Sequence, residues 1–329
     1  MNRRSFFTAT AALGATWALG AATPGPRPAP SRKNAIRFGV ATYSYWHFRT
    51  EKVPIETVID KAAEVGADAV DLLHRQMDLP EAMLREILAE LTAKGGSAAA
   101  IKSAFREKLH NIVAPYLEDI DYPAETARML SFFEGNPSDT EVKTWTANLM
   151  ARHASTRERL GHLDAFCRAL RDIIGSPAVI LDLACALDPL LLPWLGLPQE
   201  VQFLAYDIHK PRLEFLNQFF LRKYPNARAI HQDILAEPPQ HGADCIFFFK
   251  EAHRFEKRKP GCLGPFFASL RAPLLVSSLP ASDLSGHHSL EDYHTQLITK
   301  AAAGRGWDVE KIQVVNELLF VIRKERSQI

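Results

Sequence analysis

Three aspartates stand at, or just beyond, the ends of three apolar runs that have the pattern of neighbouring strands. Asp182 lies within the first run, Asp207 directly follows the second, and Asp233 comes shortly after the third. In an open α/β sheet, ligands bind outside the carboxyl ends of the strands, and an acid about 20 residues after the first turn accepts hydrogen bonds from ribose hydroxyls. Asp207 stands 25 residues after Asp182, so we expect it to bind a ribose. Asp233 is placed to reach an adenine amino group.

The loops around these acids indicate which nucleotide the site would take. The sequence has no GxGxxG motif for a pyrophosphate and no Walker loop. Acids at three successive strand ends are more typical of a pocket for S-adenosylmethionine. In such a pocket Asp182 and Ala184 would line the methionine end. Ile208, beside the ribose acid, and Ile234, beside Asp233, would lie against the nucleoside.

Other reactive arrangements are missing from the sequence. The cysteines lie far apart, without a CxxC pair or a Cys/His cluster at zinc spacing. We therefore expect reduced, buried thiols and no metal site. The chain also has no Ser/His/Asp or Cys/His constellation for nucleophilic catalysis.

The composition is that of an ordinary globular protein. The chain has 329 residues, 47% of them hydrophobic, and 39 Lys+Arg against 38 Asp+Glu for a net charge of +1. This excludes a disordered chain and a general polycation, but not a local basic patch. At about 150 residues per domain, the length favours two domains.

The second half of the chain alternates strand and helix patterns, which predicts a doubly wound, mostly parallel sheet over 176–329. The continuous apolar run at 178–184 is typical of a strand that is covered on both faces. The predicted strands span 178–184, 201–206, 227–230, 244–249 and 273–277, with helices over 210–223, 263–270 and 290–304 and a terminal hairpin over 309–314 and 317–324.

Apolar residues recur at helical spacing through much of 77–175, which is predicted to form an all-helical domain. Ser155 and Glu158 have the spacing of a capping box, which predicts a long helix from there to about Ile174. The earlier predicted helices span 79–93, 98–116, 123–134 and 140–151.

The N-terminus is predicted to be a targeting segment. Arg3 and Arg4 precede a short apolar stretch, a small-residue site near Ala22 and a Pro-rich linker that ends near residue 35. A basic start, a short apolar region and small residues are typical of a secretory signal, and the twin arginine resembles a Tat signal. The apolar run is shorter than the ~20 residues that span a bilayer, so we expect no integral membrane association.

Residues 36–76 are predicted to form a strand–helix–strand unit, with the helix over 54–65. The phrase GADAVDLLH at 66–74 resembles the start of a xylose-isomerase-like TIM barrel. A TIM barrel needs eight such units in about 250 residues. Only one precedes the change of pattern, so isomerase activity is rejected.

Several blocks carry a second and longer resemblance. They are HASTRERL at 153–160, ILDLAC at 180–185, YDI at 206–208, SLP at 278–280, LSG at 284–286 and NEL at 316–318. In this order they resemble the aminoglycoside-resistance methyltransferases of 16S rRNA, the FmrO/Rmt/ArmA/Sgm group, from about Leu79 to Lys324. The resemblance implies an α/β, Rossmann-like class I methyltransferase domain (176–329) preceded by a helical rRNA-docking domain (77–175).

The resemblance also implies an activity, a cofactor and a partner. S-adenosylmethionine would donate a methyl group to N7 of a guanine in the decoding site of the small ribosomal subunit, in the cytoplasm. Guanine N7 has a lone pair and no proton, so the reaction needs no general base. The added positive charge would repel cationic drugs of the kanamycin and gentamicin type.

Individual residues take roles from the same resemblance. Lys250 would face the target nucleotide, and Glu317 matches a family residue at the catalytic centre. Arg157 and Arg159 would meet the cofactor carboxylate or rRNA phosphate. Ala186 lies in the turn that binds the cofactor. Five of the ten residues from 250 to 259 are Lys or Arg, and this run either contacts rRNA phosphates or is a solvated surface.

The chain departs from the family pattern near the expected site. Ala186 stands where the family has Gly, and Asp188 where it has Asn. Gly at that turn permits close approach of the backbone to the ligand, whereas Ala186 would crowd it. Asp188 would add a negative charge near the methionine carboxylate. The loops after Lys250 and Gly286 also differ from the family pattern.

These departures leave two alternatives beside the methyltransferase. One is a methyltransferase-like protein with a lost or changed target. The other is an exported, non-catalytic binding protein, which would follow from a genuine Tat signal. A junction near Met77 between a truncated barrel gene and a methyltransferase would reconcile the two resemblances.

Overall fold

The computed structural model describes residues 39–41, 61, 64–65, 69–71, 79–113, 120–283 and 288–325. The chain divides into two compact units, Met1–Gln76 and Met77–Ile329. In the first unit β1 (Gly39–Ala41) pairs in parallel with β2 (Ala69–Asp71). Parallel pairing agrees with the predicted strand–helix–strand unit, although most of its predicted helix and the whole predicted signal lie outside the described residues.

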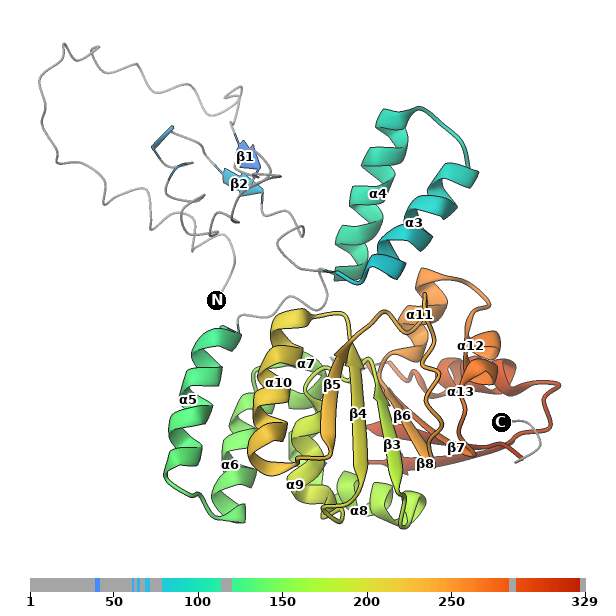
Figure 1. Cartoon of the computed structure of the whole chain (residues 1–329). Coiled ribbons are helices and arrows are strands. Elements are labelled where there is room, and N and C mark those ends of the chain that lie inside the picture. The colour runs from blue at the N-terminus through green and yellow to red at the C-terminus, as the bar shows by residue number, and fades with distance from the viewer. Residues whose placement is uncertain are drawn as a thin grey trace, which may run out of the picture. The chain divides into compact units, whose positions relative to one another are not determined.

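The second unit contains a seven-stranded sheet in the order β5-β4-β3-β6-β7-β9-β8 (Figure 1). Its first five strands are parallel, β9 is antiparallel to β7, and β8 is antiparallel to β9. This is the mixed sheet of the class I methyltransferase fold, so the predicted fold class is confirmed. The strands are β3 (Val179–Leu183), β4 (Gln202–Asp207), β5 (Ala227–His231), β6 (Cys245–Phe249), β7 (Leu274–Pro280), β8 (Asp308–Val314) and β9 (Glu317–Arg323).

Eleven helices of the described residues belong to this unit. They are α3 (Glu81–Ala93), α4 (Ala98–Val113), α5 (Tyr122–Glu134), α6 (Asp139–Met150), α7 (Ala154–Arg157), α8 (Leu163–Ile174), α9 (Leu192–Leu195), α10 (Lys210–Lys223), α11 (Ala252–Arg258), α12 (Leu263–Ser269) and α13 (Glu291–Ala302). Helices α9 and α11 were not predicted, because four and seven residues are too few to show a helical period.

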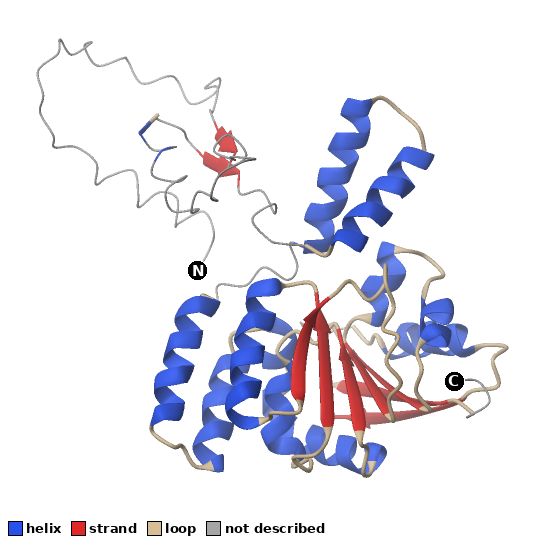
Figure 2. Ribbon diagram, viewed as in Figure 1, coloured by secondary structure: helices blue, strands red, loops and turns tan. Residues whose placement is uncertain are grey.

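Helices cover both faces of the sheet, which explains the continuous apolar runs in its central strands (Figure 2). All five residues of β6 are buried. One hydrophobic cluster joins one face to α5, α6, α8 and α10, and a second joins the other face to α11, α12 and α13. The core of this unit therefore lies on both sides of the sheet.

The helical segment 77–175 divides into two parts in the structure. Its later helices α5, α6 and α8 share a hydrophobic cluster with the sheet, so the core is continuous across residue 175. The hairpin of α3 and α4 instead has a small cluster of its own, built on Met83, Ile87 and Leu109.

The predicted long helix from Ser155 to Ile174 is wrong. The structure has the short helix α7, a 3-10 turn (Leu160–His162) and then α8. The predicted capping box does not form, because the Ser155 hydroxyl pairs with His153 Nδ1 and the Glu158 carboxylate pairs with Lys250. The break turns Arg159 into the protein interior, where it is fully buried. The capping box of this region is at Ser138 and Glu141, at the start of α6.

Two smaller expectations can be compared with the structure. All four cysteines are free and buried, so the predicted burial of the thiols is confirmed. Among the helices in the described part of the chain, none is both long and apolar enough to cross a membrane.

Candidate functional site

The register of the sheet brings the three sequence-predicted acids to one edge. Strands β3, β4 and β5 run parallel, with Leu183 opposite Tyr206 and Asp207 opposite His231. Asp182 therefore lies near the carboxyl end of β3, Asp207 ends β4, and Asp233 follows β5 by two residues. The predicted juxtaposition follows directly from this parallel order.

The turn after β3 has an unusual backbone. Ala184 has φ +54° and Ala186 has φ +46°, in the left-handed region that L-residues rarely adopt. The Ala186 N–H donates a 2.9 Å hydrogen bond to Asp207 Oδ2, so the end of β4 holds the turn in place. Both alanines are partly exposed, and they present backbone at the edge where a ligand would approach.

Asp207 is held by three donors. Its Oδ1 accepts from the His209 N–H at 2.8 Å, and its Oδ2 accepts from Ala186 and from Arg212 Nη1 at 3.1 Å. Burial by itself would raise the Asp207 pKa, but Arg212 and the two backbone donors lower it below the ordinary value. Asp207 is therefore a fixed carboxylate. The next residue, Ile208, is partly exposed, and its carbonyl accepts from His231 Nε2 at 3.0 Å.

Arg212 is a site residue that the sequence analysis missed. It is fully buried in α10, and its Nε donates to the Tyr122 hydroxyl at 3.0 Å. The guanidinium thus connects Asp207 to α5. Its position in the first turn of the helix after β4 places it near the carboxyl end of that strand, which is a weak indication of a site residue. No sequence pattern links it to Tyr122, which lies 90 residues earlier.

Asp182 is the exception among these acids. Its side chain is 1% exposed, and within the described residues neither carboxylate oxygen has a hydrogen-bond partner. Burial raises its pKa well above the ordinary 3.8, and the neighbouring Asp188 adds to the effect. Buried acceptors that lack donors are expensive unless a ligand supplies the donors. Asp182 therefore marks the part of the edge where a donor-bearing ligand fits.

Asp233 organises the loop after β5. Its Oδ1 accepts from the backbone N–H groups of Leu235 at 3.0 Å and Ala236 at 3.4 Å, and its Oδ2 pairs with Arg258. Ile234 is buried against the sheet, in the same cluster as Tyr206. Two residues predicted to lie near an adenine are thus fixed by the protein itself.

Among the described residues, Arg159 forms the most deeply buried ion-pair group. Its Nε and Nη2 donate to the two oxygens of Glu317 at 3.0 and 2.6 Å, and its Nη1 donates to Asp188. Burial would raise the Glu317 pKa, but Arg159 holds it well below the ordinary range. Internal carboxylates take three of the five N–H donors of this buried guanidinium. The expected contact of Arg159 with a cofactor or rRNA therefore stays a prediction. Asp188, which was expected to add a negative charge near the methionine carboxylate, is paired with Arg159.

Lys250 connects the edge of the sheet to α7. It follows β6 with φ +58°, and its N–H donates to the Ser278 carbonyl at 2.7 Å. Its Nζ donates to the Ser155 carbonyl at 2.9 Å and to Glu158 at 2.7 Å. Arg157, the other predicted cation of α7, is exposed.

The basic run 250–259 is only partly a solvated surface. Arg258 points inward to Asp233 and Glu86, and Lys259 also pairs with Glu86. Lys257 is exposed. Neither expected role, rRNA contact or solvated surface, describes Arg258, whose side chain pairs with carboxylates of the protein. Both roles stay open for the exposed Lys257.

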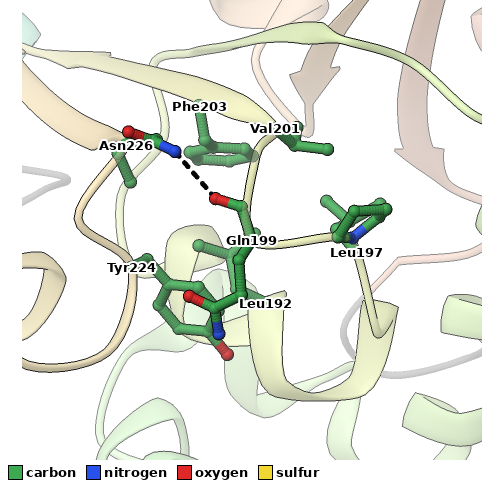
Figure 3. A pocket seen from close by; sticks show the side chains of 9 residues that line it. Leu192, Leu197, Gln199, Val201, Phe203, Tyr224 and Asn226 are labelled. Carbon is green, nitrogen blue, oxygen red and sulfur yellow. Dashed lines mark hydrogen bonds between the residues drawn. The ribbon is translucent and has the colours of Figure 1, made fainter.

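A separate pocket lies near the amino ends of β4 and β5, opposite the carboxyl ends where the predicted site residues lie (Figure 3). It is lined by residues that precede β4 and β5, including Leu197, Gln199 and Tyr224, and the Asn226 side chain donates to the Gln199 carbonyl at 2.8 Å. It contains none of the predicted site residues. Within the described ranges no group of three His, Cys, Asp or Glu side chains is arranged to hold a metal ion.

The chain matches known ribosomal RNA methyltransferases over most of its length. The family described as "Ribosomal RNA methyltransferase (FmrO)" matches residues 74–322. A 16S rRNA (guanine(1405)-N(7))-methyltransferase of Frankia casuarinae is 31% identical over 251 residues, which cover 74% of this chain and 87% of the relative. The corresponding protein of Micromonospora rosea is 27% identical over 270 residues, covering 79% of this chain and 98% of the relative.

Solved structures give the same result. The 16S rRNA methyltransferase RmtF in complex with S-adenosyl-L-homocysteine is 28% identical, with a TM-score of 0.62, and the match covers 75% of this chain and 92% of RmtF. The 16S rRNA methylase RmtB is 25% identical, with a TM-score of 0.60, covering 77% of this chain and 93% of RmtB. The family match begins at residue 74, so the signal and the barrel-like unit remain predictions.

Ala186→Gly should stabilise the protein by about 0.5–1 kcal/mol, because glycine adopts the left-handed turn without strain. Urea unfolding of both forms measures the difference. Ala127→Gly, at an exposed position inside α5, is the matched control and should destabilise by about 1 kcal/mol. Equal losses in the two variants would contradict a strained turn.

Arg159→Met should destabilise the protein by about 3–5 kcal/mol, because it leaves Asp188 and Glu317 buried without their cation. Combining it with Asp188→Asn and Glu317→Gln should restore much of this loss, since no uncompensated charge then remains. Urea midpoints of the single and triple variants test the cause. Simply additive losses would argue against a buried ion-pair group.

Asp182 should make the free protein less stable as pH rises. A carboxyl group whose folded pKa is raised favours the folded state below its unfolded pKa, and this contribution is lost as pH rises through the folded pKa. Asp182→Asn should therefore become more stable relative to the unchanged protein from about pH 4 upward. Thermal unfolding at several pH values measures this, with the same substitution at an exposed position, Asp172→Asn, as the matched control.

Proposed function

Because the chain belongs to the ribosomal RNA methyltransferase (FmrO) family, we propose that it methylates N7 of guanine 1405 in 16S rRNA, with S-adenosylmethionine as the donor. The relatives named above carry this activity in their names. The observation in the structure that supports it is the unpartnered, buried carboxylate of Asp182, at the sheet edge where this fold binds ligands.

The residues at this edge fit the cofactor by their hydrogen-bonding chemistry. S-adenosylmethionine carries an ammonium, two ribose hydroxyls and an adenine amino group, all of which are donors. Asp182 and the turn at Ala184 and Ala186 would hold the methionine end, with the exposed Arg157 available for its carboxylate. Asp207 and Ile208 would hold the ribose. Asp233 and Ile234 would lie at the adenine, as the sequence analysis proposed.

Catalysis in this site reduces to positioning. The bound cofactor supplies a methyl group that is already activated on a sulfonium, and guanine N7 offers a lone pair without a proton. Lys250 would face the target base, and its contacts with α7 fix its ammonium at the sheet edge. Glu317 would act through Arg159, which holds it beside the cofactor turn. The protein would need only to align the two reactants and exclude water.

The small ribosomal subunit is the proposed partner, with docking by the helices of residues 77–175. The target base would leave its stack to reach the site. Its methylation adds a positive charge to the decoding site, which explains resistance to cationic aminoglycosides. Because its substrate is ribosomal RNA, we place the protein in the cytoplasm. Export remains the alternative if the predicted Tat signal acts.

The test is methyl transfer by the full chain to purified small ribosomal subunits with labelled S-adenosylmethionine. Primer extension after borohydride and aniline treatment should stop at guanine 1405. Asp182→Ala should lower kcat/KM by about 10- to 100-fold, because it removes the carboxyl group that would accept hydrogen bonds from the cofactor. Asp172→Asn should leave transfer unchanged.

Two other outcomes would redirect the proposal. Cofactor binding without a stop at guanine 1405 would indicate a changed target, the alternative suggested by the departures after Lys250 and Gly286. Neither binding nor transfer would overturn the proposed function.

A further inference from the structure

Arg258 lies between the loop that follows β5 and the hairpin of α3 and α4. It is the last residue of α11, and its side chain is 10% exposed. One guanidinium nitrogen, Nη2, pairs with Asp233 Oδ2 and lies 3.3 Å from Glu86 Oε2 of α3. A single side chain thus contacts both the loop after β5 and the α3–α4 hairpin. Figure 1 shows the ribbons of α3 and α11, the two helices that carry Glu86 and Arg258.

Glu86 receives a second cation from the same segment. Lys259 Nζ donates to Glu86 Oε1 at 2.7 Å, so each oxygen of this carboxylate has one basic partner. The hydrophobic cluster of the hairpin is separate from the two clusters that flank the sheet. Charge is therefore an important part of what joins α3 to α11, and charged contacts at a partly exposed site weaken in salt.

Movement of Arg258 would be transmitted to the loop after β5. Asp233 is 2% exposed, and its other oxygen accepts the backbone N–H groups of Leu235 and Ala236. The orientation of this carboxylate fixes both the course of the loop and the oxygen that can face an adenine. Arg258 supplies the charged partner that sets this orientation.

We propose that Arg258 is a positioning residue that links the seating of the α3–α4 hairpin to the adenine end of the cofactor site. This rests on the proposed function, in which Asp233 lies at the adenine. If the hairpin shifted when it bound the ribosomal subunit, the ion pair between Glu86 and Arg258 would change. The position of Arg258 beside Asp233 would then change as well, and with it the affinity for the cofactor. By linkage, the bound cofactor would favour one seating of the hairpin and thereby affect subunit binding.

The test measures binding of S-adenosyl-L-homocysteine to the full chain by titration calorimetry, without ribosomal subunits. Arg258→Gln should weaken binding about tenfold, and Glu86→Gln about threefold, since the latter removes only the outer, partly exposed ion pairs. Glu81→Gln is the matched control: it breaks an exposed pair with Arg85 on the same helix and should not alter the affinity.

Salt and thermal stability separate positioning from a general structural effect. Raising salt to about 0.5 M should bring the unchanged protein close to Glu86→Gln in affinity, because screening weakens the same ion pairs. The melting temperature of Glu86→Gln should stay close to that of Glu81→Gln. Arg258→Lys should recover part of the affinity lost in Arg258→Gln, because it keeps the charge.

The results distinguish the two proposals. If the unchanged protein binds S-adenosyl-L-homocysteine and Glu86→Gln binds it as tightly as Glu81→Gln, the link through Arg258 is overturned. An affinity loss in Glu86→Gln that persists undiminished in high salt would also overturn it. If the unchanged protein does not bind S-adenosyl-L-homocysteine at all, the proposed function itself fails.

Discussion

The buried guanidinium of Arg159 ties together three segments that are far apart in the chain. It lies just after α7, and its partners are Asp188 in the turn that follows β3 and Glu317 at the start of β9. The Glu317 partner lies 158 residues away along the sequence. Removing one member leaves another charge uncompensated in the interior, so the three segments are held in one arrangement. The segment after β3, the last pair of strands and the entry to α8 are all held by this arrangement.

Pairing with arginine is also what distinguishes the acids at the sheet edge from one another. Asp207 has Arg212, Asp233 has Arg258, and Asp188 and Glu317 share Arg159. Asp182 stands among them without a hydrogen-bond partner in the described residues, and its pKa is raised where that of Asp207 is lowered. The paired acids therefore hold segments of the protein together, whereas the Asp182 carboxyl group lacks a hydrogen-bond partner within the described residues.

The two departures from the family pattern in the turn after β3 have different physical meanings. Ala186 adopts the left-handed backbone of a glycine and is held there by Asp207, so the turn keeps its course at the cost of local strain. Asp188 is drawn into the Arg159 group and does not add an unopposed charge at the methionine end. Contacts within the protein therefore accommodate both departures.

The sequence determined the sheet and the edge where the site lies, because strand and helix periodicity and strand-end acids are local signals. Strand-like runs alternating with helices predicted the parallel sheet, and Asp182, Asp207 and Asp233 were expected at its carboxyl edge. The blocks from HASTRERL to NEL were sufficient to suggest the family. Only the tertiary structure decided which cation meets which carboxylate. Arg159, Arg212 and Arg258 find partners in distant segments, and the free energy of a buried charge pair depends on geometry that no local pattern encodes. The same reason explains the wrong long helix after Ser155, since the inward turn of Arg159 overrides local helix propensity.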